Sequence, residues 1–371
     1  MHRSISLPRR ERVGTLARPL ALAAFAAAVA VAAPTSTPAA FRDVLDTPAI
    51  RSPLAAQALL NGAARAGERL VVVGQRGHIL ASDDGGKRWS QADVPVASDL
   101  VAVSFGDDAN GWAVGHDGVV LKTGDAGRTW AVQLDGRRLG PLLEAYYANA
   151  APAALDGDPK RAEAIVAEAH RLASQGAENP WLDVWFRDAR EGYVVGAFGL
   201  VLHTADGGAT WTPWLHAIDN PKGLHLYAVR GVGEDVYIVG EQGLALKLDP
   251  AAKRFRALDM PYPGTLFGVT GSAGTVVVHG LRGTVLRSAD AGRSWQPVAT
   301  GLQVGLTGNT RTDDGRLVIV SQAGHVLVSS DGGATFATAR IERPQPAAAV
   351  VAAANGTLVT AGPRGLQLTN H

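Results

Sequence analysis

The sequence predicts an all-β fold, a seven-bladed β-propeller that carries a small helical insertion. A Gly-x-x-Gly tetrad recurs after β-branched runs, and a Ser/Thr-x-Asp-x-Gly turn follows most of these tetrads. Most tetrads recur about every 41 residues, which is the length of a propeller blade of four short strands. The 44 Gly and absence of Cys among 371 residues agree with a turn-rich fold that uses no disulfide.

The first 40 residues are predicted to be an export signal. Five arginines precede an uninterrupted apolar run over 20–33, and small residues follow it. The run is shorter than the ~20 residues of a membrane span, so we expect cleavage, with an uncleaved anchor as the alternative. Removing 1–40 takes five Arg and one Glu from 35 basic and 34 acidic residues, leaving 30 and 33, a net charge of −3. The full chain's formal charge of +1 argues against nucleic-acid binding.

The number of tetrads predicts the number of blades, which is seven. They occupy 74–77, 115–118, 196–199, 240–243, 280–283, 321–324 and 362–365, where the sixth begins with Ser in place of Gly. Their closing glycines are 41, 81, 44, 40, 41 and 41 residues apart. The doubled spacing predicts an insertion at about 136–180, between the second and third blades. Seven blades and this insertion account for residues 41–371 and leave no room for a second domain.

The second repeated element resembles the Asp box of BNR repeats. Its aspartates are Asp84, Asp125, Asp206, Asp290 and Asp331, and its aromatics are Trp89, Trp130, Trp211, Trp295 and Phe336. The carboxylate can accept N–H groups within the turn, glycine can adopt a positive φ, and the aromatic can pack between sheets. We therefore predict that these residues are structural rather than catalytic. A degenerate sixth copy keeps Asp249 and Phe255 without the turn glycine.

Helices are predicted inside the insertion. Asp158 and Pro159 suit a helix start, and Gly176 suits its end. An apolar stripe lies between them, formed by Ala162, Ile165, Val166, Ala169 and Leu172. A shorter helix is predicted over 141–148. The pair is either a packed, lid-like hairpin or a surface on which a partner docks.

The two ends of the chain are predicted to meet in the last blade. The last unit shows only three strands before the sequence stops. Residues 41–46 could supply the fourth strand and so remove an exposed sheet edge. Deleting residues 41–46 should then lower the melting temperature sharply.

One face of the propeller carries the candidate binding residues. In a four-stranded antiparallel blade the tetrads are turns between the second and third strands, opposite the Asp boxes. We predict an arginine-rich sector that binds carboxylates or phosphates, formed by Arg76, Arg282 and Arg364, with Arg343 from a connection between blades. Asp117, Phe198 and Gln242 complete the candidate partner-binding surface. The alternative is that the arginines are solvated turn residues or form internal salt bridges.

The seven units resemble the photosystem II stability/assembly factor family and its non-photosynthetic bacterial relatives. The resemblance covers about 41–371 and is strongest from 182–186 through 194–199 into 204–211. It implies an exported, non-enzymatic assembly or scaffold factor. Photosynthetic members bind a membrane-protein precursor through an arginine-rich patch, for which Arg76, Arg282 and Arg364 are the matching positions. We expect a monomeric periplasmic protein that binds an envelope membrane protein or transporter and needs no cofactor.

The alternative function is that of a sialidase-like BNR glycoside hydrolase. Residues 41–44, Phe-Arg-Asp-Val, depart from the entry motif of those enzymes, and no Tyr/Glu pair is readable from spacing. Most glycosidases need two carboxylates that face each other. Three acidic residues are predicted on the tetrad face and could supply such a pair, so the hydrolase remains an alternative: Asp117, Asp219 and Glu241. The ten His show no H-x-H or H-E-x-x-H spacing, so no metal site is predicted.

Overall fold

The computed structural model describes residues 42–149 and 158–369, whose strands form seven antiparallel sheets. The strands of the first four sheets are β1 (Leu60–Ala66), β2 (Arg69–Gly74), β3 (Ile79–Ser82) and β4 (Ser90–Gln91); β5 (Leu100–Phe105), β6 (Gly111–Gly115), β7 (Val120–Thr123) and β8 (Ala131–Leu134); β9 (Trp181–Phe186), β10 (Gly192–Gly196), β11 (Val201–Thr204) and β12 (Thr212–Pro213); and β13 (Leu226–Val232), β14 (Asp235–Gly240), β15 (Ala245–Asp249) and β16 (Arg254–Ala257).

The remaining three sheets continue the pattern, except that the last one has three strands. They are β17 (Leu266–Ser272), β18 (Thr275–Gly280), β19 (Val285–Ser288) and β20 (Gln296–Pro297); β21 (Leu306–Arg311), β22 (Leu317–Ser321), β23 (Val326–Ser329) and β24 (Ala337–Thr338); and β25 (Ala349–Ala352), β26 (Leu358–Gly362) and β27 (Gly365–Thr369).

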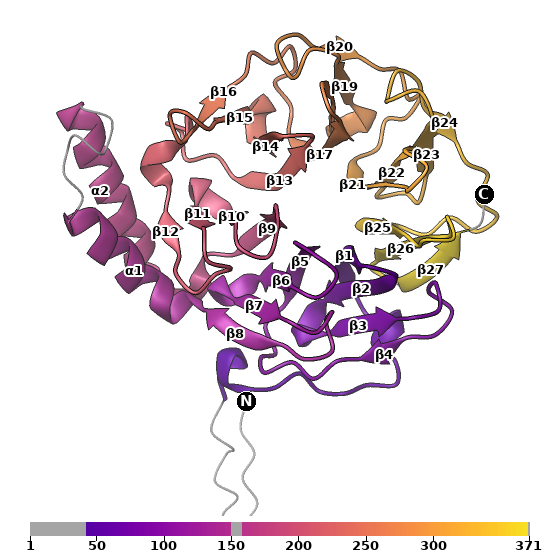
Figure 1. The fold of residues 1–371 in the computed structure, drawn as a ribbon, viewed down its shortest axis with the longest axis horizontal. Helices are drawn as coiled ribbons and strands as arrows, with labels where there is room; N and C mark the ends of the chain where they lie inside the picture. The colour runs from indigo at the N-terminus through magenta and orange to yellow at the C-terminus, as the bar shows by residue number, and fades with distance from the viewer. Residues whose placement is uncertain (1–41, 150–157, 370–371) are drawn as a thin grey trace, which may run out of the picture. The chain divides into compact units, whose positions relative to one another are not determined.

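The sheets are arranged around a ring, with the first strand of each sheet innermost (Figure 1). β1 contacts β5, and the contacts continue through β9, β13, β17, β21 and β25 until β25 contacts β1. This closed succession of antiparallel sheets is a propeller-like fold. The second strands are its most buried elements: Val71, Val72 and Val73 of β2 have no exposed surface. Each of these strands packs on both faces, so it is an apolar run rich in β-branched residues instead of an alternating one.

The prediction that residues 41–46 complete the last sheet is wrong for residues 42–46, the part of that segment the structure describes. Val44–Asp46 form a 3₁₀ helix, η1, which Asp43 caps by accepting the N–H of Leu45 at 2.9 Å. Leu45 is buried in the apolar cluster of the first and second sheets. Arg137 pairs with the carboxylates of both Asp43 and Asp46 at 2.8 Å. The cap, the burial and the ion pairs favour this position over an added strand.

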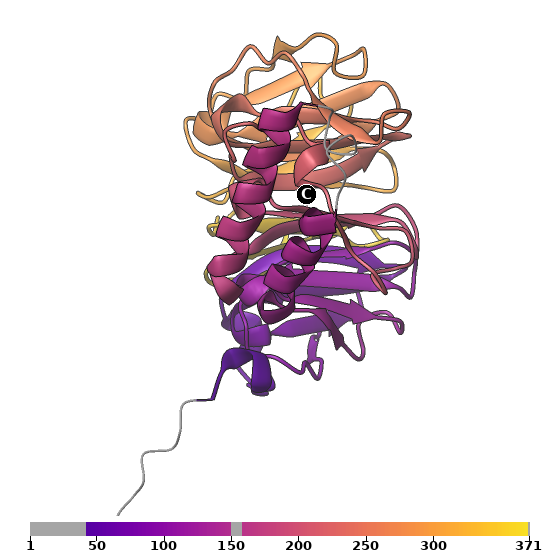
Figure 2. The same ribbon diagram turned by 90° about the vertical axis from the view of Figure 1, so that its left-hand side faces the viewer.

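The insertion forms two helices on the outside of the second and third sheets (Figures 1 and 2). α1 spans Gly136–Asn149 and α2 spans Pro159–Ser174. Asp158 caps α2 by accepting the N–H of Lys160 at 3.0 Å, as the sequence suggests. α1 begins earlier than the predicted 141–148, because the backbone oxygen of Asp135 accepts the N–H groups of its first turn.

The apolar sides of both helices are buried against the propeller. Leu143 of α1 and Leu172 of α2 share one core cluster with Trp112 and Trp181 of the neighbouring sheets. Four of the five residues in the predicted stripe of α2 are buried, and Val166 packs at its margin. This packing favours the hairpin interpretation of the insertion.

The export prediction cannot be followed into the structure, since residues 1–40 lie outside the described part of the chain. Residues 42–369, as far as they are described, belong to one compact unit. Within the described ranges, no helix has the length and apolar character to cross a membrane.

Candidate functional site

The tetrads form the turns at one end of the sheets, each between a second and a third strand. Five of them are single 3₁₀ turns: η3 (Gln75–Gly77), η4 (His116–Gly118), η7 (Ala197–Gly199), η9 (Glu241–Gly243) and η10 (Leu281–Gly283). The third tetrad residue in these turns has φ between 53° and 57°, at Arg76, Asp117, Phe198, Gln242 and Arg282. A positive φ is uncommon for residues other than glycine. The side chains of this tetrad face are therefore held by a backbone conformation that few sequences adopt.

Arg364 lies in a different kind of turn. β26 and β27 pair Gly362 with Gly365, so Pro363 and Arg364 form a two-residue loop. Arg364 is not among the described residues with positive φ, and Gly365 takes that role at 87°. Arg364 is therefore on the predicted face but is not equivalent in backbone geometry to Arg76 and Arg282.

The four candidate arginines are exposed: Arg76, Arg282, Arg343 and Arg364. Among the described residues, no ion pair or side-chain hydrogen bond holds their guanidinium groups. Only their backbones are engaged, as when the N–H of Arg76 donates to Asp99 Oδ1 at 2.7 Å and the oxygen of Arg343 accepts from Gln367 Nε2 at 2.8 Å. They come from the fifth sheet, the connection after the sixth, the seventh and the first, which follow one another around the ring. The structure therefore disfavours internal salt bridges for these four residues.

Phe198 is where the insertion reaches the tetrad face. The guanidinium of Arg171, on α2, lies 5.0 Å from the Phe198 ring centroid and also pairs with Glu168 at 2.6 Å. On the other side, the N–H of Phe198 donates to His225 Nδ1 at 2.8 Å, with the two rings edge to face. Phe198 is 37% exposed. No local spacing in the sequence signals Arg171 or His225, because each reaches Phe198 from 27 residues away.

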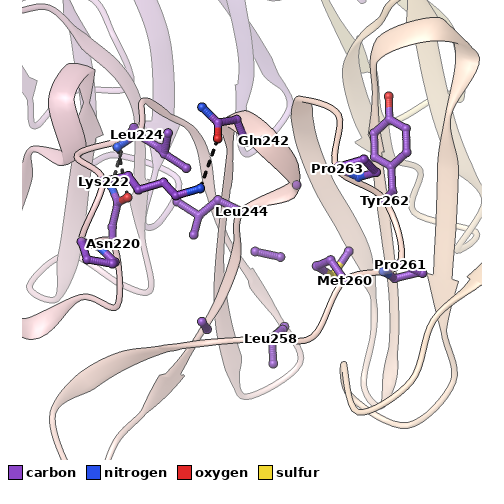
Figure 3. Close-up of a pocket in the computed structure, with 14 residues that line it drawn as sticks. Asn220, Lys222, Leu224, Gln242, Leu244, Leu258, Met260, Pro261, Tyr262 and Pro263 are labelled. Atoms are coloured by element: carbon purple, nitrogen blue, oxygen red, sulfur yellow. Dashed lines mark hydrogen bonds between the residues drawn. The ribbon is translucent and has the colours of Figure 1, made fainter.

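A groove of about 470 Å³ lies next to Gln242 (Figure 3). Three segments line it, 220–224, 242–245 and 257–263. Lys222 Nζ donates to Gln242 Oε1 at 3.5 Å across one wall. A second groove of about 570 Å³ shares residues 220–222 and is bounded on its other side by α2. The tetrad face is thus hollowed between the insertion and the fourth sheet.

A third cavity, of about 580 Å³, is lined by residues from the first strands of all seven sheets. Asp183 on its wall is 3% exposed and accepts the N–H of Val229 at 2.8 Å. It also pairs with the guanidinium of Arg230 on the next sheet. Burial raises the pKa of Asp183, and Arg230 opposes that rise. The pair fastens the third sheet to the fourth, so its position in the cavity has a structural explanation.

His279 is a second buried polar group beside this cavity. It has no exposed surface, and its Nδ1 hydrogen-bonds the backbone oxygen of Leu306 at 3.0 Å. That oxygen can only accept, so Nδ1 carries the proton and Nε2 accepts from Asn309 Nδ2 at 2.9 Å. Burial lowers the pKa of His279 to about 4. This neutral imidazole joins the fifth sheet to the sixth.

The Asp-box carboxylates lie in the turns at the opposite end of the sheets. Asp84 Oδ1 accepts the N–H groups of Lys87 and Arg88 at 3.0 and 2.9 Å. Asp206 accepts both the N–H and the hydroxyl of Thr210, and these hydrogen bonds lower its pKa to about 2. The same turn bonds recur at Asp125, Asp290 and Asp331. The box aromatics are buried at Trp130, Trp211 and Trp295 and partly buried at Trp89 and Phe336.

Asp219 and Glu241, two of the three carboxylates considered for a glycoside hydrolase, also have structural partners. Asp219 Oδ1 accepts from Nε and a terminal nitrogen of Arg254, at 2.9 and 2.7 Å. Glu241 accepts the N–H of His225 at 2.9 Å. In the described part of the chain, no group of three His, Asp or Glu residues could hold a metal ion.

The ring of antiparallel sheets defines this chain as a β-propeller with glycine-bracketed turns and exposed arginines at one end. Solved propellers superpose on it along most of their length. A structure described as YCF48 bound to D1 peptide has a TM-score of 0.61 and 16% identity, over 87% of this chain and 95% of that one. YCF48 from Cyanidioschyzon merolae gives 0.60 and 15%, over 86% and 97%. The WD40 propeller domain of Doa1 gives 0.60 and 8%, over 88% and 97%. At such identities these likenesses show the fold alone.

The chain belongs to the family of the photosynthesis system II assembly factor YCF48, whose model matches residues 55–143 and 163–347. Two curated relatives are photosystem II assembly lipoproteins named Ycf48. The one from Synechococcus sp. (strain CC9902) is 27% identical over 161 residues, 42% of this chain and 48% of its own length. The one from Parasynechococcus marenigrum (strain WH8102) is 31% identical over 159 residues, 42% and 47%. These matches span about half the length of the relatives.

Proposed function

We propose that this chain is an exported, non-enzymatic, seven-bladed propeller that assists the assembly of an envelope membrane protein or transporter by binding it. One observation supports this most directly: the guanidinium groups of Arg76, Arg282, Arg343 and Arg364 are exposed and unpaired among the described residues of one face. Family membership supports it as well, since the family is that of an assembly factor, the curated relatives are named assembly lipoproteins, and a solved YCF48 propeller is described as bound to D1 peptide.

The chemistry of the face fits an acidic or carboxylate-bearing segment of a protein. Arginine binds carboxylates through paired N–H groups, with more geometric specificity than lysine. Phe198 and Gln242 would add an aromatic and an amide contact farther around the ring. The carboxylate of Asp117, whose turn lies between those of Arg76 and Phe198, would repel acidic groups of the partner at that position. We propose that the partner lies across these turns and reaches the grooves beside α2.

We also propose a periplasmic monomer. The predicted export signal and the lipoprotein names of the curated relatives both point outside the cytoplasm. This sequence contains no Cys, so it offers no thiol for a thioether-linked lipid.

The test is a cross-linking pull-down from the host envelope with a triple variant, Arg76→Glu, Arg282→Glu and Arg364→Glu. We expect loss of the captured partner with a melting temperature near that of the wild type, because these side chains hold no other group. The control carries the same charge change at the Asp-box end, Arg88→Glu, Arg128→Glu and Arg293→Glu, and should retain the partner. If the first variant still captured the partner, the proposal that the partner binds through these arginines would be refuted. Hydrolysis of a sialoside or aryl glycoside by the purified protein would refute the non-enzymatic function.

A further inference from the structure

Two strongly exposed apolar side chains border one pocket on the tetrad face. Ile50 and Leu54 are 75% and 61% exposed, more than the other large apolar side chains in the described ranges. Both line a pocket of about 540 Å³ between the connection over 47–58 and the first tetrad turn. Single exposed apolar residues are ordinary on a protein surface, whereas two that share a pocket indicate a binding site.

The backbone that carries these two side chains is fixed on the first sheet. Gln91 bonds the connection twice: its Nε2 donates to the oxygen of Ile50 at 3.0 Å, and its Oε1 accepts the N–H of Ser52 at 2.9 Å. The hydroxyl oxygen of Ser52 in turn accepts the N–H of Leu54 at 3.2 Å. Ile50 and Leu54 are therefore presented by a fixed backbone, so an occupant of the pocket would lose little affinity to the cost of ordering it.

The free charge at this pocket is positive. Arg51 and Arg76 line it, and none of its described lining residues is Asp or Glu. Arg51 is already paired, since Asp93 Oδ1 accepts from its Nε and a terminal nitrogen at 3.0 and 2.8 Å. Arg76 donates its backbone N–H to Asp99 Oδ1 at 2.7 Å, but no described residue bonds its guanidinium. That guanidinium is therefore the group at the pocket that remains able to bind a carboxylate.

The turn of Arg364 lies against the same connection. Arg364 precedes Gly365, and a Cβ built on Gly365 would lie 2.2 Å from the oxygen of Ala56. Ala56 belongs to the 3₁₀ helix η2 (Ala55–Gln57), which directly follows Leu54. One unpaired guanidinium thus lines the pocket, and a second lies on the turn beside it.

His78 supplies a buried polar wall to the pocket. It is 7% exposed, and its Nδ1 has no hydrogen-bond partner among the described residues. Burial lowers the pKa of His78, so its imidazole is neutral at pH 7. The pocket therefore keeps a polar atom that the fold leaves unsatisfied, while its charge comes from arginine.

We propose that this pocket binds a protein partner through apolar side chains next to a carboxylate, as in a Leu-Glu-Leu sequence. The apolar side chains would cover Ile50 and Leu54, and the carboxylate would bond the guanidinium of Arg76. This charge favours a partner over the chain's own N-terminal segment, because residues 1–41 contain a single acidic residue, Glu11. The inference rests on the proposed function for the face that it uses, and it adds the apolar half of the contact.

Methyl NMR on the wild-type protein tests the pocket directly. The probe is the peptide acetyl-Gly-Leu-Glu-Leu-Gly-amide, used at up to about 10 mM because so small a contact binds weakly. We expect saturable shifts at the methyl groups of Ile50 and Leu54 and none at Leu281, an exposed leucine of the fifth tetrad. Replacing both leucines of the peptide by Ser, or its Glu by Lys, should weaken binding at least about tenfold. The absence of saturable shifts, or equal binding of the three peptides, would overturn the proposal.

Matched variants identify the groups that bind the peptide. Ile50→Ser with Leu54→Ser keeps every arginine and should weaken peptide binding at least about tenfold, with a melting temperature near that of the wild type because both side chains are exposed. Arg76→Met should weaken binding at least about fivefold. Leu281→Ser, the same kind of change at another tetrad, should bind the peptide as the wild type does. Wild-type affinity in the double serine variant would overturn the proposal.

The envelope pull-down separates this inference from the proposed function. If the double serine variant captures the partner as the wild type does while the triple glutamate variant loses it, the pocket is refuted and the arginine face stands. If the triple glutamate variant retains the partner, the proposed function fails. In the free protein, methyl contacts of Ile50 or Leu54 with another part of this chain, or with a second copy as concentration rises, would also refute the assignment of the pocket to a partner.

Discussion

Acid should weaken this protein through one buried histidine. The folded protein holds His279 neutral, with a pKa lowered to about 4 by burial, while in the unfolded chain it titrates near its ordinary value of about 6.5. Between pH 6.5 and about pH 4 His279 is therefore protonated in the unfolded state but neutral in the folded state. The free energy of unfolding decreases as the pH is lowered through this interval. The stabilisation is complete above pH 6.5 and is lost on acidification.

The size of this effect follows from the two pKa values. A difference of about 2.5 units corresponds to about 3 kcal/mol at the low-pH limit and about 2 kcal/mol already at pH 5. The ordinary carboxylates remain ionised at pH 5 in both states, so they contribute little to this interval. Other groups change the unfolding free energy with pH equally in the wild type and in a variant that lacks only the imidazole, so their effect cancels in the difference between the two proteins.

The assay is urea unfolding followed by tryptophan fluorescence at several pH values between 7.5 and 5. His279→Gln should be less stable than the wild type at pH 7.5, because the bonds to Leu306 and Asn309 are disturbed. The stability gap between them should shrink by about 2 kcal/mol at pH 5. His116→Gln, at an exposed position, should show no such narrowing. A gap that stays constant with pH would refute the linkage of stability to His279.

Three further substitutions test the packing and the turns, each by equilibrium unfolding. Asp183→Ala should cost about 1–3 kcal/mol, because it removes the buried acceptor of the Val229 N–H and one partner of the partly exposed Arg230 guanidinium; a loss below about 0.5 kcal/mol would contradict that role. Leu143→Ala should cost about 2–5 kcal/mol if α1 is part of the core, and a neutral result would mean that the helix is only loosely attached. Asp206→Ala should lower the melting temperature, and the difference from the wild type should vanish as pH falls toward 2, since its carboxylate stabilises the fold only while ionised.

The parts of the fold that the sequence predicts are those built from local contacts. In an Asp box the carboxylate bonds backbone groups three and four residues ahead, so a short motif contains the whole interaction. The same holds for the tetrads and for the cap of α2 by Asp158. Repetition then makes the overall ring predictable, because each unit can bury its faces only against another unit.

The features that escape prediction depend on contacts between distant residues. The local sequence predicts a strand at Asp43, but its partner Arg137 lies in the first turn of α1, and no local pattern connects the two residues. Arg364 occupies a tetrad like Arg76, yet its turn is a two-residue loop of Pro363 and Arg364 in which Arg364 does not take the positive φ of Arg76. Phe198 is placed by Arg171 and His225, which reach it from opposite sides in the chain. The candidate face could be predicted as a set of turns, but not which groups border each side chain.

The three-stranded last sheet also determines how the ring is held shut. The first and last sheets share no strand, so side-chain packing around Leu60, Leu70 and Val351 joins them, together with the Arg65–Asp313 pair that reaches from the first sheet to the sixth at 2.6 Å. Within the described residues, no backbone hydrogen bond between strands crosses this seam. Separating the first sheet from the last would therefore break side-chain packing and the ion pair while each sheet keeps its own backbone hydrogen bonds.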